Sequence, residues 1–174
     1  MKVRIKFFLM DYYLWIILLL ILFAAGLLFF FLLRGYNWTA MISIIGGLFS
    51  AIYFIQKQEL DEAKLFKELF LEFNRRYDYL NENLNNIIRN KNNAKDLGFD
   101  DINTLYDYFN LCGEEYLFYK KGYIYPKVWR SWVRGMKVFY EDERIQKKWL
   151  KEFGTESYYG FDLSKEISKL PNKE

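Results

Sequence analysis

The feature that most constrains this chain is an uncharged apolar run near its N-terminus. Residues 12–33 read YYLWIILLLILFAAGLLFFFLL, which is 22 residues without Asp, Glu, Lys or Arg. As a helix rising 1.5 Å per residue, the run would span roughly 33 Å, enough to cross the hydrocarbon core of a bilayer. A secretory signal peptide fits less well, because its apolar region is usually about 7–15 residues long and here a second apolar run follows almost at once. The sequence therefore predicts a transmembrane helix over residues 12–33.

The second apolar run, residues 38–55, is shorter and lies near the lower limit for crossing a membrane. The connection over residues 34–37 is so short that the two runs would form an antiparallel hairpin, and lipid requires both to be helical. Basic residues flank the hairpin on its outer ends, at Lys2, Arg4, Lys6, Lys57, Lys64 and Lys67. The turn itself holds only Arg34. This distribution predicts that both termini are cytoplasmic in a bacterial inner membrane.

Small residues form a series on the second membrane helix. Ser43, Gly47 and Ala51 are spaced four apart, and Gly46 and Ser50 lie beside them. Such spacing lets helices approach closely in lipid, so the series could pack against the first helix or form a homo-oligomer. Neither predicted span contains an ionisable Asp, Glu, Lys or Arg, which disfavours a transporter or an ion-selective pore.

The chain after residue 55 has the periodicity of packed helices. Residues 56–90 contain no Gly or Pro. Apolar residues there alternate in spacing between three and four, at Ala63, Phe66, Phe70, Phe73, Tyr77, Leu80, Leu84 and Ile87. This pattern predicts that the second membrane helix continues into the cytoplasm as a stalk that packs against a partner helix.

Further helices are predicted beyond an Asn-rich loop at residues 90–99. Asp100 or Asp101 would cap the next helix and Gly122 would end it. Its apolar series is Ile102, Leu105, Phe109, Cys112, Tyr116 and Tyr119. Pro126 would begin a third helix. The apolar face of that helix comprises Trp129, Trp132, Val133, Met136 and Phe139 or Tyr140.

The C-terminal part of the chain carries one more helical series and a tail. The acidic residues 141–143 precede Ile145, Trp149 and Phe153, which belong to a new helix or to a kinked continuation ended by Gly154. A short helix is expected near residues 163–170. Alternating strand patterns are missing after residue 56. The predicted fold is all-α, a two-helix transmembrane hairpin followed by a cytosolic bundle of three or four helices.

The expected domain organisation follows the changes in polarity. A basic cytoplasmic N-terminus occupies residues 1–11 and the transmembrane hairpin occupies residues 12–55. A cytosolic helical domain is expected over residues 56–154, followed by a tail at residues 155–174.

The composition removes the usual catalytic machinery. The chain has no histidine and a single cysteine, Cys112. It therefore lacks the commonest general base and metal ligand, and it cannot form an internal disulfide. No glycine-rich phosphate loop or nucleophile elbow is present. The adjacent Glu114 and Glu115 would point about 100° apart on a helix, away from a shared site. We expect no enzyme activity, metal or cofactor, and we expect Cys112 to pack in the core.

The stretch PKVWRSWVRGMK places Lys127, Arg130, Arg134 and Lys137 in one stripe on the predicted third helix. The stripe is either a solvated face over an aromatic core or a binding surface for an anion. Anionic lipid head groups are the favoured anion, because a tethered domain stays close to the membrane. Nucleic-acid phosphates are the less favoured choice, since interleaved acidic residues dilute the positive field.

Residues 108–136, YFNLCGEEYLFYKKGYIYPKVWRSWVRGM, resemble a segment of small uncharacterised bacterial membrane-anchored proteins with a cytosolic helical domain. The stretch ESYYGFD at residues 156–162 is also similar to that group. The resemblance rests on packing and turn residues and lends no active site. In outline the chain also resembles two-helix membrane effectors of bacterial anti-phage and conflict systems.

These observations favour a non-catalytic inner-membrane protein whose cytosolic domain is an interaction or sensing module. The expected partners are the lipid bilayer, anionic head groups and a cytosolic protein, with homo-oligomers left open. One alternative is a membrane-disrupting effector that oligomerises through the second transmembrane helix. Another is a membrane-tethered nucleic-acid binder.

Overall fold

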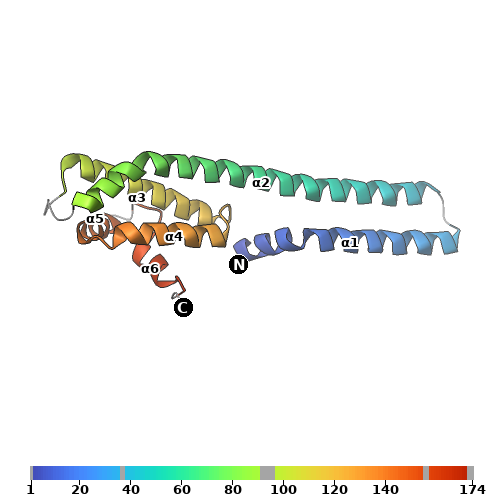
Figure 1. The fold of residues 1–174 in the computed structure, drawn as a ribbon. Coiled ribbons are helices and arrows are strands. Elements are labelled where there is room, and N and C mark those ends of the chain that lie inside the picture. The colour runs from blue at the N-terminus through green and yellow to red at the C-terminus, as the bar shows by residue number, and fades with distance from the viewer. Residues whose placement is uncertain (1, 36–37, 91–96, 155–156, 172–174) are drawn as a thin grey trace. The chain divides into compact units, whose positions relative to one another are not determined.

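The computed structural model describes residues 2–35, 38–90, 97–154 and 157–171. Within these residues the chain is helical and contains no strand, which confirms the predicted all-α class. The helices, drawn in Figure 1, are α1 (Lys2–Arg34), α2 (Trp38–Arg89), α3 (Phe99–Lys120), α4 (Pro126–Tyr140), α5 (Glu143–Phe153) and α6 (Leu163–Ser168). The chain divides into two compact units, Met1–Leu65 and Phe66–Glu174.

The first unit contains α1 and the N-terminal part of α2. Both helices are long and apolar enough to cross a membrane. Almost none of their most apolar windows is buried, and large side chains such as Leu19, Phe23 and Phe49 are exposed. The core helix of a water-soluble protein would bury most of such a surface. Length, composition and exposure in this unit are therefore all consistent with lipid contact.

The helix α2 runs through the change in polarity without a break. It is 52 residues long, because neither Gly nor Pro interrupts it after Gly47. The expected domain boundary at residue 56 thus falls inside α2, and the two units meet later, between Leu65 and Phe66.

Some of the segments named in the predictions from sequence lie outside the residues that the structure describes. These are the side chains of the basic N-terminus at residues 1–11, residues 36–37 of the turn, and residues 91–96 of the Asn-rich loop. Residues 155–156 and 172–174 of the tail also lie outside them.

The second unit is built around one hydrophobic core, and each of its helices places buried side chains in that core. From α2, Phe73, Leu80, Leu84 and Ile87 are buried, as the predicted series requires. The first member of that series, Ala63, is exposed and belongs to the first unit. The packed series therefore begins at Phe66, which lies against the core.

The helix α3 is buried on two sides. Leu105, Phe109 and Cys112 of its predicted series are in the core. A second series on the same helix, Tyr108, Leu111 and Glu115, is buried as well. An element that is covered on two faces occupies a central position, and α3 accordingly contacts α4 and contributes the largest set of buried residues in the unit.

The two ends of α3 are fixed by local hydrogen bonds. At its start the N-cap is Gly98, and its N–H donates to the Asp101 carboxylate at 3.0 Å. The predicted N-cap at Asp100 or Asp101 is thus wrong, although Asp101 still stabilises the helix from its first turn. At its end Gly122 adopts φ +80°, and Tyr123 N–H donates to the Phe118 carbonyl oxygen, which is the glycine-ended cap that was predicted.

The segment that follows α4 forms a new helix. Asp142 is its N-cap and accepts a hydrogen bond from the Arg144 N–H at 2.9 Å, which separates α5 from α4. Ile145 and Trp149 are buried, as predicted. Phe153 was expected in the same series, but its side chain is exposed because α5 reaches its last residue there.

Aromatic rings hold the C-terminal segment onto the core. Trp149 of α5 contacts Phe109 of α3 edge-on at 4.9 Å and stacks on Tyr158 at 5.4 Å between ring centroids. Phe161 contacts Trp149 at 5.3 Å and Trp129 at 5.7 Å. A turn with positive φ at residues 159 and 160 lets Tyr158 and Phe161 both enter the core. The short helix α6 then falls within the predicted range.

Candidate functional site

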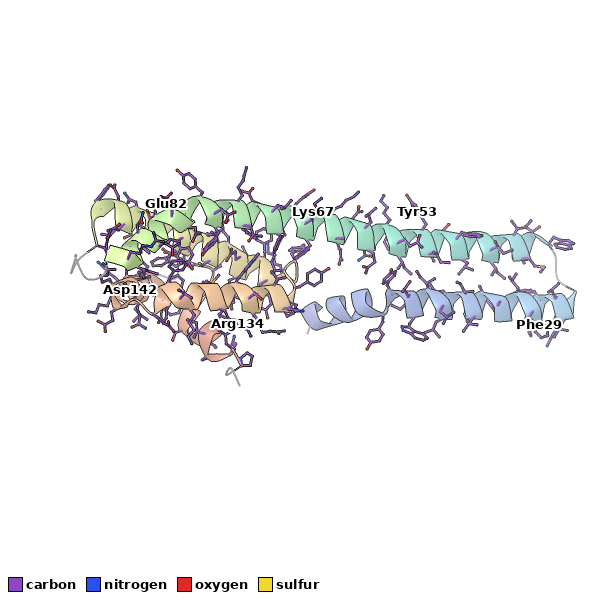
Figure 2. The ribbon with its side chains drawn as sticks, in the orientation of Figure 1. Phe29, Tyr53, Lys67, Glu82, Arg134 and Asp142 are labelled. Carbon is purple, nitrogen blue, oxygen red and sulfur yellow. The ribbon has the colours of Figure 1, made fainter. Side chains whose placement is uncertain are left out.

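The basic stripe lies on α4 and is exposed. Proline at the first turn starts this helix, and the polar and apolar residues then separate onto different sides. Trp129, Val133, Met136 and Phe139 are buried. Lys127, Arg130, Arg134 and Lys137 are all exposed, and Figure 2 labels Arg134 on α4. We call these four residues the basic face.

The charges of the basic face are largely unneutralised. Lys137 forms an exposed ion pair with Glu141 at 3.7 Å, a contact of small energetic value. Lys127, Arg130 and Arg134 form no side-chain hydrogen bond or ion pair with any described residue. The basic face is therefore free to meet an external anion.

Other cations of the unit are engaged in holding helices together. The Arg144 guanidinium donates to the Ile87 carbonyl oxygen of α2 at 2.6 Å and to both oxygens of Asp142. The hydrogen bond from Arg144 lowers the pKa of the Asp142 carboxyl below its ordinary value. Arg144 thus caps the C-terminal end of α2 and fixes the start of α5, a structural role that the basic face does not share.

A buried carboxylate behind the basic face also has a structural explanation. The indole N–H of Trp129 donates to the Glu166 carboxylate at 3.1 Å, and the Lys169 ammonium donates to the other Glu166 oxygen. Charge-assisted hydrogen bonds of this kind compensate for the burial of the carboxylate. They tie α6 to α4.

The small residues of α2 are exposed within the first unit. Ser43, Gly46, Gly47 and Ser50 are exposed, and Ala51 is half-buried. The two hydroxyls donate to carbonyl oxygens of their own helix, each at 2.9 Å. A Cβ atom added at Gly46 or Gly47 would meet no neighbouring atom within 4 Å. The role of these residues in helix packing stays a prediction.

The structure offers little for metal or thiol chemistry. Across the described ranges, no group of three or more His, Cys, Asp and Glu side chains could hold a metal ion. Cys112 is buried, and burial followed by the charge of Glu115 raises the pKa of its thiol well above its ordinary value. A buried, protonated thiol is a poor nucleophile, and the predicted core position of Cys112 is confirmed.

The second unit contains a cavity of about 180 Å³ that the sequence did not predict. Residues from three helices line it: Asn74 and Tyr77 from α2, Tyr108 and Glu115 from α3, and Ser131, Trp132, Gly135 and Met136 from α4. Ser131 and Gly135 are exposed, so the cavity reaches the surface beside α4. A second buried face of α3 could have been predicted from the sequence. Tyr108, Leu111 and Glu115 are spaced three and four residues apart, like the apolar series that begins at Ile102.

The two adjacent glutamates of α3 have different surroundings, as their spacing predicted. Glu114 is half-buried and pairs with both terminal nitrogens of Arg76, at 2.5 and 3.2 Å. Glu115 is buried and forms no hydrogen bond with the described residues. Burial, opposed by the charge of Arg76 and assisted by that of Glu114, raises the pKa of Glu115 to about 8.

Internal contacts of the described residues do not account for the basic face or for the Glu115 cavity. Comparison of the chain with protein-family models, with curated proteins and with solved structures finds no match in any of the three.

Proposed function

We propose that this chain is a non-catalytic membrane protein of the bacterial inner membrane. Its helical second unit acts as an interaction or sensing module at the cytoplasmic surface, and the basic face binds anionic lipid head groups. The observation that carries the proposal is the set of three exposed cations, Lys127, Arg130 and Arg134, without partners among the described residues.

The anchor is supported by the first unit. An exposed apolar surface on two helices of membrane-spanning length is costly in water and favourable in lipid. The basic residues at both outer ends of the apolar runs favour cytoplasmic termini. Because α2 continues from the apolar run into the second unit, a membrane that holds the first unit would also tether the helical domain.

The basic face suits a lipid surface by its charge. Each Lys or Arg close to an anionic leaflet contributes about 1 kcal/mol to attraction, and tethering removes most of the cost of bringing the domain there. A nucleic acid would meet the same four cations but would gain nothing from the tether. Lipid is accordingly the proposed partner.

Co-sedimentation with vesicles tests this proposal. Residues 57–174 contain every residue of the core cluster and serve as a soluble fragment. We expect the fragment to bind anionic vesicles and not neutral vesicles, and to dissociate from the anionic vesicles as the salt concentration rises. The double variant R130E/R134E should lower vesicle binding at least tenfold, because reversing two of the four positive charges cancels the net charge of the basic face.

The matched control is K147E/K151E, which makes the same change in charge at exposed positions of α5. It should leave most of the binding intact. Equal losses in both variants would show that net charge, and not the basic face, attracts the fragment. Salt-sensitive binding to duplex DNA in place of vesicles would instead identify a nucleic-acid binder.

The second candidate function is a membrane-disrupting effector that oligomerises through α2. The exposure of Gly46 and Gly47, with open space where a side chain would lie, is the observation that favours it. If this function is real, expression of the chain arrests growth, and G47I relieves the arrest without lowering the amount of protein in the membrane. Arrest that persists in G47I would remove its support.

A further inference from the structure

The cavity beside α3 is lined by one buried carboxyl group, that of Glu115. The Glu115 carboxyl forms no hydrogen bond with the described residues. The Tyr108 hydroxyl is also buried and has no partner of ordinary hydrogen-bond geometry among them. The neighbouring Cys112 thiol forms a weak hydrogen bond with it, and the hydroxyl is too enclosed to be reached from the cavity. Buried polar groups are normally satisfied, so the Glu115 carboxyl, which lines the cavity, points to a bound partner that supplies donors.

The rest of the lining is mainly aromatic and apolar. Tyr77 from α2 and Trp132 and Met136 from α4 enclose the space, and the Asn74 amide adds another polar group. Aromatic rings beside a carboxyl are a favourable setting for an organic cation, because the ring faces attract positive charge. The volume sets the size of the occupant, since a cavity of about 150 Å³ accommodates a ring as large as benzene.

The charges around Glu115 do not oppose a cation. Arg76 on α2 is the cation that acts on Glu115, and it is already held by both oxygens of Glu114. The other titratable groups near the cavity are Tyr77, Tyr108 and Cys112. The lining residues of α4 carry no charge.

We propose that this cavity binds a small primary organic ammonium ion, with its N–H groups directed at Glu115 and Asn74. Its carbon chain packs against the aromatic rings. Glu115 releases one proton to solvent when it pairs with the cation near neutral pH. The site lies within the second unit and does not depend on what the basic face binds.

Ligand titration of the full chain in detergent micelles tests the proposal, with n-butylammonium as the probe and 1-butanol as its uncharged analogue. We expect ligand-observed NMR and calorimetry to show saturable binding of butylammonium and none of butanol. The affinity should rise about tenfold from pH 6 to pH 7, as ionisation of Glu115 becomes easier. Calorimetry in buffers of different ionisation enthalpy should show the release of about one proton per ligand.

Two variants and a control decide whether the cavity is the site. E115Q should weaken binding at least tenfold, whereas E82Q, which removes an exposed carboxylate from α2, should not change it. G135L fills the mouth of the cavity, where a Cβ atom meets nothing within 4 Å, and should abolish binding in a folded protein. Butylammonium binding that survives in E115Q and in G135L, equal binding of butanol, or no binding of either probe would overturn the proposal.

Discussion

Glu115 shows how one buried side chain can control the pH dependence of this protein. Its folded-state pKa is raised from 4.5 to about 8, with burial as the main cause. Between these two values the folded protein binds more protons than the unfolded chain. The free energy of unfolding therefore falls as pH rises through this window, by at most about 1.4 kcal/mol per pH unit, and levels off above it.

The variant E115Q should remove this dependence, because the amide is uncharged at every pH. Urea unfolding of residues 57–174 between pH 5 and pH 9 measures the effect. Relative to the wild type, E115Q should gain stability as pH rises, by a few kcal/mol in total at most. The control E82Q should follow the wild-type curve. Parallel curves for the wild type and E115Q would contradict the assigned environment of Glu115.

Individual residues were predictable where their side chains behave as their type usually does. Cys112 was placed in the core from its position in an apolar series, and it is buried. The divergence of Glu114 and Glu115 followed from helical geometry. The burial of Glu115 was not predictable in this way, because Glu is almost never buried without a partner and the sequence does not reveal that α4 covers it.

Glycines on α3 and α4 show how packing decides the effect of a small change within an element. A Cβ atom at Gly113 would lie 3.2 Å from the Tyr158 Cβ, whereas one at Gly135 would meet nothing within 4 Å. G113L should therefore destabilise the fragment by about 1–3 kcal/mol through overpacking. G135A should stabilise it by roughly 0.5–1 kcal/mol through helix propensity. Thermal unfolding of both variants measures the contrast, and equal shifts of the same sign would refute it.

Helix boundaries were predictable where backbone chemistry sets them, and less so where side chains compete. The fixed φ of Pro126 marks the start of α4, and the positive φ of Gly122 marks the end of α3. Both boundaries are observed. The N-cap of α3 is Gly98 because Asp101 accepts a hydrogen bond from its backbone N–H. The exposure of Phe153 reflects the end of α5, which periodicity alone does not locate.

At the scale of the molecule, composition and packing divide the chain at different positions. Polarity changes near residue 56, but the second unit begins at Phe66, the first residue of α2 that packs against the core. The sequence therefore predicted the existence of an apolar part and a packed helical part more closely than their limits. The cavity was not predictable, since its lining comes from helices that are distant in sequence.

The proposed function requires the helical domain to be anchored at the cytoplasmic side of a membrane. Labelling of single cysteines in intact cells with a membrane-impermeant maleimide tests this most directly. The wild-type chain serves as the blank, because Cys112 is buried. W38C, at the exposed start of α2, reports on the turn between the apolar runs, and K147C reports on the exposed surface of α5.

The proposed orientation, with both termini in the cytoplasm, predicts that W38C reacts in intact cells and that K147C reacts only after the membrane is permeabilised. Reaction of K147C in intact cells, or protection of W38C at the same level as K147C, would contradict the proposed anchoring.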